Sequence, residues 1–132
     1  MIVKVSVENV TPLWPQLEPL IKSVVDPIGT HDAEDVRRSL MTNFSHLWVQ
    51  WSDKVEALVI SEFINYPRGL WLRLWAGAAR EDIKGEWQQF RPVITEWKNI
   101  HQCKGIEIIG RMGWLRVFPD ARFDGAIMRT TK

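Results

Sequence analysis

Cysteine and long apolar runs are almost absent from this chain. Its single cysteine, Cys103, cannot form an internal disulfide or build a cysteine-based zinc cluster. Even the apolar stretch Leu70–Ala79 is interrupted by Arg73, and no run approaches the roughly 20 residues that a membrane span requires. The chain also begins without the basic and apolar segment of a secretory signal. These absences predict a protein of a reducing cytoplasm that does not span a membrane.

An excess of charge of either sign is missing too. The sequence has 17 Lys and Arg against 16 Asp and Glu, which gives a formal net charge of +1. A chain this balanced has no overall field to attract phosphate backbones or anionic lipid. The three histidines, His31, His46 and His101, share no spacing typical of metal ligands. We therefore expect neither a nucleic-acid partner nor a bound metal.

What the sequence does contain is typical of one folded domain. It has 132 residues, 45% of them hydrophobic, and shows no internal repeat or Gly/Ser linker. We therefore expect residues 1–132 to form a single domain. Tryptophan is frequent, with 8 copies. Trp71 and Trp75 lie four residues apart and are predicted to share one face of a strand, either in the core or on an exposed surface for protein contact.

The first half of the chain predicts one strand, two helices and three further strands. Ile2–Val7 alternates like a strand, and Thr11-Pro12 is typical of a helix start because threonine caps and proline fits the first helical position. A second helix follows a cap at Thr30 or Asp32. The short breaks between the next three strands imply antiparallel neighbours. These strands are Leu47–Trp51, Val55–Ile64 and Leu70–Trp75.

The second half begins with a long helical pattern. Apolar residues recur at helical spacing from Glu81 to His101, and Pro92 in the middle predicts a kink or two consecutive helices. The segments that follow are a short strand at Ile106–Ile109, one or two helical turns at Arg111–Phe118 and a final strand at Phe123–Thr130. A helix this long between two strands implies a right-handed crossover and a parallel strand pair.

These elements predict an α/β fold. The sheet is mixed, an antiparallel meander plus a parallel pair flanked by helices, in the order β-α-α-β-β-β-α-β-α-β. In such a sheet the parallel strands part where the crossover helix begins, and ligands tend to bind at strand ends next to a helix N-terminus. Here that point is Ala76–Arg80.

Two segments resemble a known family. One is Leu72–Ala78 followed by the helix, and the other is Gly105–Phe118, with a Gly-Arg-x-Gly-Trp ending at Gly110–Trp114. Together with the element order they resemble the small GNAT-like acetyltransferase-fold proteins of tailed phages and prophages, over essentially the whole chain. The resemblance implies transfer of an acetyl group from acetyl-CoA to a small-molecule or protein amine, in the cytoplasm of a bacterial host cell.

The resemblance also implies where acetyl-CoA binds. GNAT enzymes hold its pyrophosphate with backbone N–H groups of a Gln/Arg-x-x-Gly-x-Gly/Ala loop at a helix N-terminus. Arg73–Ala78 fits this signature with alanine in place of the first glycine, and Gly77–Arg80 is the alternative loop. The residues implied for cofactor binding are Arg73, Trp75, Gly77, Ala78, Ala79 and Arg80. Glu81 and Asp82, directly afterwards, favour a helix start yet repel a pyrophosphate.

The catalytic groups of the family are matched in part. GNAT enzymes usually deprotonate the amine through a carboxylate or water on the meander strands, and often protonate the thiolate with a tyrosine of the last helix. Glu62 is the candidate base, with a place on a solvated strand face as the alternative. The helical turns after Gly110 hold Trp114 and no tyrosine, while Tyr66 lies in a predicted hairpin turn.

Two functions follow from these observations. The first is an acyl-CoA-dependent N-acyltransferase of phage or prophage origin, with Glu62 as base. The second is a non-catalytic GNAT-fold protein, a phage structural or host-interaction protein that binds a phage or host protein through tryptophan and arginine and is found with the virion. The incomplete loop signature and the missing tyrosine favour the second, and the element order favours the first.

Overall fold

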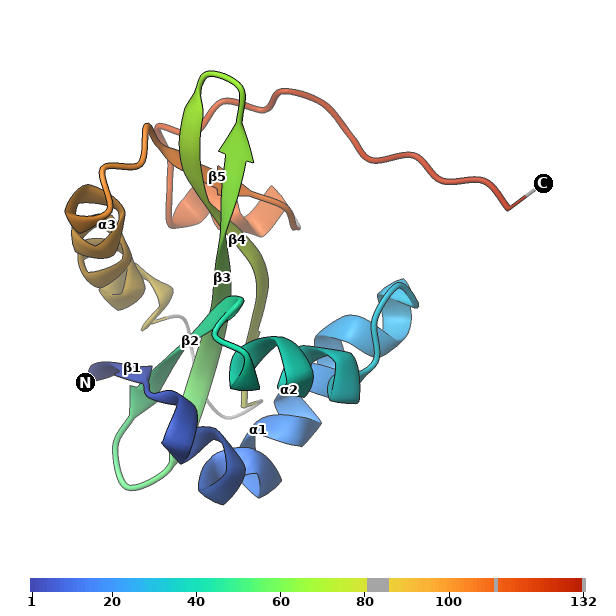
Figure 1. The fold of residues 1–132 in the computed structure, drawn as a ribbon, viewed down its shortest axis with the longest axis vertical. Coiled ribbons are helices and arrows are strands. Elements are labelled where there is room, and N and C mark those ends of the chain that lie inside the picture. Colours follow the sequence, from blue (N-terminus) through green and yellow to red (C-terminus); the bar gives the residue numbers. More distant parts are fainter. Residues whose placement is uncertain (81–85, 111, 132) are drawn as a thin grey trace.

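A computed structural model describes residues 1–80, 86–110 and 112–131. Within them, one five-stranded sheet runs in the order β1-β2-β3-β4-β5, with α1 and α2 on one face and α3 on the other (Figure 1). The strands are β1 (Ile2–Val5), β2 (Ser45–Trp51), β3 (Val55–Tyr66), β4 (Gly69–Ala79) and β5 (Ile106–Ile108). The helices are α1 (Val7–Ile28), α2 (Ala33–Met41) and α3 (Phe90–Ile100), with 3-10 turns η1 (Glu86–Gln89) and η2 (Met112–Arg116).

The pairing of the strands confirms the predicted fold class. Strands β2, β3 and β4 form an antiparallel meander that β1 extends at one edge. Strand β5 lies parallel to β4, with Leu72 opposite Ile106 and Leu74 opposite Ile108. The connection between these two strands contains α3, as expected for a parallel pair. The sheet is therefore mixed and flanked by helices.

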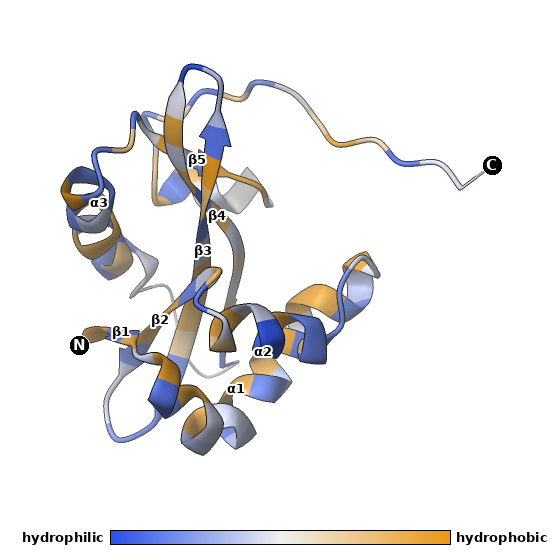
Figure 2. Ribbon diagram, viewed as in Figure 1, coloured by the Kyte–Doolittle hydropathy of each residue, from blue (hydrophilic) through white to orange (hydrophobic). Residues whose placement is uncertain are grey.

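Each face of the sheet carries its own apolar core. On the α1 side, Leu17 and Ile21 pack with Leu58 of β3, and on the α3 side Phe90 and Ile94 pack with strand residues. Hydrophobic and hydrophilic residues alternate around α1 and α3, as expected for helices with one face on a sheet (Figure 2). In the described part of the chain, no helix is both long and apolar enough to cross a lipid bilayer.

Helix α1 begins earlier than the sequence predicts. It starts at Val7, after Ser6, instead of at Pro12, so the prediction of a start at Thr11-Pro12 is wrong. The helix holds four prolines, which lie on its exposed side, while a buried stripe faces the sheet. Proline has no backbone N–H, so the carbonyl one turn before it loses its helical hydrogen bond, but on the exposed side this carbonyl stays hydrated. Burial of the apolar stripe therefore outweighs the free-energy cost of the prolines. The stripe comprises Val10, Trp14, Leu17, Ile21 and Val25.

The other two helices agree better with the predictions. Asp32 caps α2, and its side chain accepts from the Asp35 backbone while the Asp35 side chain accepts from the Asp32 backbone, so the predicted cap is confirmed. The segment around Pro92 consists of η1 followed by α3, which is the predicted alternative of two consecutive helices. The predicted start of this helical region at Glu81 lies outside the described residues.

Strand β4 is longer than predicted, and this moves the expected loop. Gly77, Ala78 and Ala79 lie in β4, each opposite a residue of β3, instead of in a loop after it. The prediction of a turn over Ala76–Arg80 is therefore wrong for Ala76–Ala79, which are strand residues. In a sequence, a run of small residues suggests a turn. Here β3 extends beside these residues and pairs with them in the sheet, so they continue the strand.

The predicted final strand does not form. Residues 121–131 have no regular secondary structure, and Phe123, Ile127 and Met128 are exposed. A strand needs a neighbour to receive its backbone hydrogen bonds. Strand β5, the free edge, has three residues. The predicted Phe123–Thr130 strand is therefore wrong for this structure.

Candidate functional site

Strands β4 and β5 part after a short parallel stretch. The backbone N–H of Ile109 donates to the carbonyl of Leu74 at 2.9 Å, just beyond the last registered pair. Strand β4 continues to Ala79 beside β3, whereas the chain after β5 bends at Gly110. We call the space between Trp75–Gly77 on one side and Ile109–Gly110 on the other the wedge.

A bulge in β4 lies at the start of the wedge. Ser61 pairs with Leu74 and Ile60 pairs with Ala76, so Trp75 is an extra residue in β4. A bulge changes the face to which the following side chains point. Trp75 and Ala76 both pack on the α1 side, while Leu74 packs on the α3 side.

The indole of Trp114 fills the wedge on the α3 side. A Cβ placed on Gly77 would lie 2.6 Å from Cζ2 of Trp114, and one placed on Gly110 would lie 2.9 Å from Cδ1 of Trp114. The Trp87 ring lies 5.7 Å from the Trp114 ring and packs in the same core. Both distances to a Cβ are too short for any side chain, so the two glycines are what allow the indole to lie there.

On the α1 side, the wedge adjoins a partly enclosed cavity of about 350 Å³. Trp75 and Ile109, the first residues on the two sides of the wedge, both line it. The cavity is therefore continuous with the point where the parallel strands part, which is where open α/β sheets tend to bind ligands. Its remaining lining residues are Val25, Ile28, Thr30, His31, Glu62, Arg73, Ile127 and Arg129.

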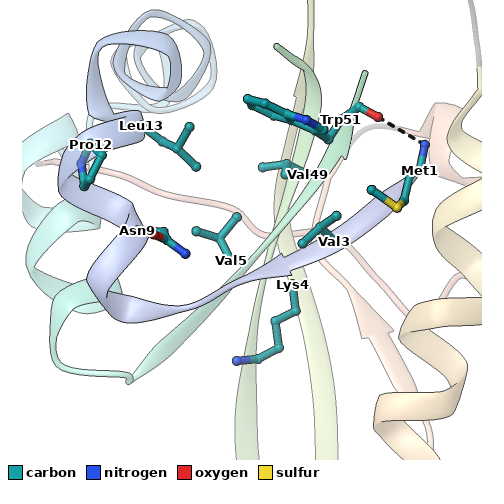
Figure 3. A pocket seen from close by; sticks show the side chains of 9 residues that line it. All are labelled: Met1, Val3, Lys4, Val5, Asn9, Pro12, Leu13, Val49 and Trp51. Atoms are coloured by element: carbon teal, nitrogen blue, oxygen red, sulfur yellow. Dashed lines mark hydrogen bonds between the residues drawn. The ribbon is translucent and has the colours of Figure 1, made fainter. Parts of the chain in front are cut away.

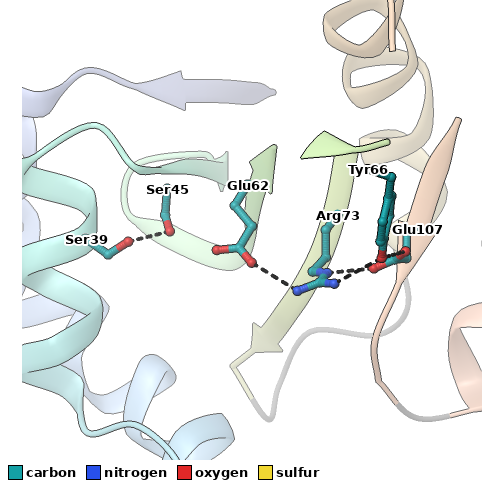
Figure 4. A network of polar contacts seen from close by, with 6 residues as sticks. All are labelled: Ser39, Ser45, Glu62, Tyr66, Arg73 and Glu107. Atoms are coloured by element: carbon teal, nitrogen blue, oxygen red, sulfur yellow. Dashed lines mark hydrogen bonds and ion pairs between the residues drawn. The ribbon is translucent and has the colours of Figure 1, made fainter. Parts of the chain in front are cut away.

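A polar network runs along one side of this cavity (Figure 4). The Arg73 guanidinium donates to Glu107 at 2.7 Å, to Glu62 at 3.5 Å and to the Tyr66 hydroxyl at 3.4 Å. The Tyr66 hydroxyl donates to Glu107 at 2.6 Å. Burial pulls the pKa of Arg73 down, but its bonds to Glu107 and Tyr66 outweigh this effect and leave that pKa raised. Arg73 therefore stays charged and fixes both carboxylates.

The structure brings three of the predicted site residues together. Glu62, Arg73 and Trp75 all line the cavity, and Glu62 and Arg73 are ion-paired neighbours on adjacent strands. The Trp75 ring lies 5.2 Å from the ring of His31, which follows α1. The Nε1–H of Trp75 is buried and has no acceptor among the residues that the structure describes.

The remaining predicted residues lie apart from the cavity. Gly77 faces the Trp114 indole, while Ala78 and Ala79 pair with Leu58 and Ala57 of β3. Arg80 follows β4, and its guanidinium lies 3.7 Å from the Glu56 carboxylate. The backbone N–H of Arg80 donates to the carbonyl of Glu56 at 3.0 Å, so this amide is already bonded to β3. Their assignment to cofactor binding stays a prediction.

Sequence reasoning missed several residues of the site. Glu107 lies in register with Arg73, and this pairing depends on how β5 aligns with β4. His31 and Arg129 reach the cavity from segments far apart in the sequence. A lone acid between Ile106 and Ile108 was the available signal for Glu107, because a charge in so short an apolar strand needs a partner.

A second cavity has fewer ionisable side chains on its walls. It has a volume of about 400 Å³ and lies between β1, β2 and the first turns of α1, with Val3, Val5, Leu13 and Val49 among its walls (Figure 3). Lys4 also lines it, and its side chain extends away from the apolar walls in that view. The amino group of Met1, another lining residue, donates to the carbonyl of Trp51 at 3.2 Å. No acid or histidine of the described residues lines it, so it lacks a base for acyl transfer.

The described residues do not fit acetyl-CoA in this arrangement. A ligand arm that entered between the parting strands would pass through the wedge, and the Trp114 indole already occupies that space between Gly77 and Gly110. The predicted helix start at Glu81 and Asp82, next to the expected pyrophosphate, lies outside the described residues.

Comparison with known proteins identifies the fold. No protein-family model and no curated protein sequence matches the chain. Among solved structures, an aminoglycoside acetyltransferase from an uncultured soil metagenomic sample, in complex with trehalose, aligns with a TM-score of 0.77 at 12% identity, over 100% of this chain and 95% of that one.

Two further solved structures have a similar fold. A ribosomal-protein-alanine N-acetyltransferase from Brucella melitensis biovar Abortus 2308 aligns with a TM-score of 0.70 at 10% identity, over 98% of this chain and 99% of that one. A predicted acetyltransferase with acetyl-CoA from Clostridium acetobutylicum aligns with a TM-score of 0.66 at 12% identity, over 98% of this chain and 95% of that one. Identities this low establish the fold alone. The chain has the GNAT acetyltransferase fold.

Proposed function

We propose that this protein is an acyl-CoA-dependent N-acyltransferase that transfers an acetyl group to an amine. The observation that carries the proposal is the cavity with Glu62 on its wall, which adjoins the wedge in a fold shared with acetyltransferases. One structure with this fold contains acetyl-CoA, which supports acetyl-CoA as the donor. A phage or prophage origin stays a prediction from Gly110–Trp114.

Glu62 is the proposed base. Its side chain is 17% exposed, and its carboxylate accepts from Arg73 at 3.5 Å, a distance at the limit of a hydrogen bond. Arg73 makes its short bond, at 2.7 Å, to Glu107 instead. Glu62 is therefore held in place but keeps the capacity to accept from an ammonium group in the cavity and to take its proton.

The tryptophan in the wedge supports a second candidate. Because Trp114 occupies the space that the cofactor would need, a non-catalytic protein that keeps the GNAT fold as a binding scaffold is consistent with the packing of Gly77 and Gly110. The two candidates differ in whether the indole leaves the wedge.

The direct test is acetyl transfer by the full chain. We expect release of free CoA thiol when acetyl-CoA is mixed with the protein and a panel of small amines and peptides, followed with a thiol reagent. A rate equal to that without protein for every amine, with folding verified by circular dichroism, would favour the non-catalytic candidate.

Replacing Trp114 tests the wedge itself. In Trp114→Ala the indole no longer competes for the space, so we expect acetyl-CoA to bind at least about tenfold more tightly than to the wild type in a calorimetric titration. Trp71→Ala is the matched control, because the Trp71 ring lies over Gly105 instead of Gly77. Equal affinities of Trp114→Ala and wild type would show that the indole does not block the cofactor.

A further inference from the structure

The charged groups around the cavity do not cancel locally. Glu62 and Glu107 share one guanidinium, that of Arg73, and the shorter bond goes to Glu107. Two carboxylates with one cation leave one negative charge. Of the two acids, Glu62 lines the cavity, and its carboxylate is bonded only weakly to Arg73, at 3.5 Å. This wall of the cavity is therefore suited to a cation such as an ammonium group.

A positive charge lines the same cavity from another element. Arg129 belongs to the C-terminal segment, and no carboxylate pairs with it among residues 1–80, 86–110 and 112–131. A guanidinium is the usual partner of a carboxylate. This part of the cavity is suited to an anion.

The rest of the lining is apolar and the space is small. Val25 and Ile28 of α1 contribute to the walls with Ile109 and Ile127. A volume of about 350 Å³ lies near the lower end of the range for small-molecule sites, about 300–1,000 Å³. A space near this lower limit suits a small ligand of about the size of an amino acid better than a folded protein segment.

We infer that the acceptor is a small zwitterion, an amino acid with an apolar side chain. Its ammonium group lies at Glu62, its carboxylate lies at Arg129, and its side chain packs against the apolar walls. This inference rests on the proposed function, because it names the substrate class of the same site. The amine that faces Glu62 is then the group that accepts the acyl group.

Binding without any acyl-CoA tests this assignment. We would titrate the protein with L-leucine, with L-leucinamide, which lacks the carboxylate, and with N-acetyl-L-leucine, which lacks the free amine. Chemical shifts of amides near the cavity would report binding. We expect each blocked compound to bind at least about tenfold more weakly than leucine, because each loses one charged partner.

A charge reversal at Arg129 identifies which end of the ligand it holds. In Arg129→Glu, leucine should lose its advantage over leucinamide, so the ratio of the two affinities should fall to about one or below. Arg68→Glu in the β3–β4 turn makes the same charge change on an exposed residue outside the cavity, and should leave the ratio unchanged. Arg129 is exposed and outside regular structure, so folding should be unaffected.

The outcomes separate this inference from the proposed function. Three results would each overturn the zwitterion: leucinamide bound as tightly as leucine, no binding of leucine at about 10 mM, or an unchanged ratio in Arg129→Glu. A peptide N-terminus would then be the better acceptor if leucinamide binds. Leucine binding as expected, without acetyl transfer from acetyl-CoA, would instead contradict the acyltransferase and leave the amino-acid site standing.

Discussion

Glu62→Gln should abolish most acetyl transfer while leaving the fold intact. The amide keeps the shape of the side chain and a carbonyl that Arg73 can bond, but it cannot take a proton from the ammonium group. Removal of a general base typically lowers the rate about 10²–10⁴-fold, and we expect a loss of at least about 100-fold in kcat/KM. The measurement is thiol release from acetyl-CoA with the best amine of the panel.

The control for this variant is Glu96→Gln on the exposed side of α3. It removes one carboxylate on the opposite face of the sheet from the cavity, so its rate should equal that of the wild type. A Glu62→Gln rate within about threefold of the wild type would mean that the amine arrives without its extra proton or that another group removes it. The assignment of Glu62 as base would then be wrong.

The stability of the protein should fall between about pH 6.5 and pH 4 because of His46. This histidine is 6% exposed, and burial, followed by the charges of Lys4 and His101, lowers its pKa from 6.5 to about 4. Its Nδ1 lies 3.3 Å from the hydroxyl of Ser61, which also accepts from the Trp48 indole at 2.9 Å. The native state therefore holds a neutral imidazole.

The sign and size of the effect follow from this difference in pKa. Between pH 6.5 and pH 4 the unfolded chain binds a proton at His46 and the native chain does not, so stability declines as the pH falls through this window. The shift corresponds to about 3 kcal/mol at the low end. Above pH 7 both states are neutral at this position, and the contribution is constant.

A paired comparison isolates the histidine from other titrating groups. The free energy of unfolding from urea denaturation should decline less steeply in His46→Gln than in the wild type between pH 6.5 and pH 4. Because carboxylates titrate in both proteins, the difference between the two curves is the quantity of interest. Curves that stay parallel throughout this window would show that His46 is protonated as readily in the native state as in the unfolded one.

Much of the fold could be predicted because local patterns specify it. The short breaks between β2, β3 and β4 predicted an antiparallel meander, and the length of the connection to β5 predicted a parallel pair. The cap at Asp32 predicted the start of α2. Helix α1 was placed too late because Pro12 fits a first helical position as well as an exposed interior one. The strand at Phe123–Thr130 was predicted from the local sequence after Pro119 and Asp120, but a strand also requires a neighbour.

The site was less predictable because it depends on register and on close packing. Glu62 was identified from its strand, yet its relation to Glu107 follows from Arg73 lying opposite both acids. The role of Gly77 was predicted as a backbone approach to a phosphate, whereas its missing side chain makes room for Trp114. A sequence shows that a glycine is present and does not show which neighbour requires it.

A calorimetric titration of the wild-type full chain with acetyl-CoA tests the proposed function most directly. We expect saturable binding with one molecule per chain, weaker than to Trp114→Ala because the indole must leave the wedge. Absence of binding at millimolar acetyl-CoA, to the wild type and to Trp114→Ala alike, would contradict the proposed acyltransferase and favour the non-catalytic candidate.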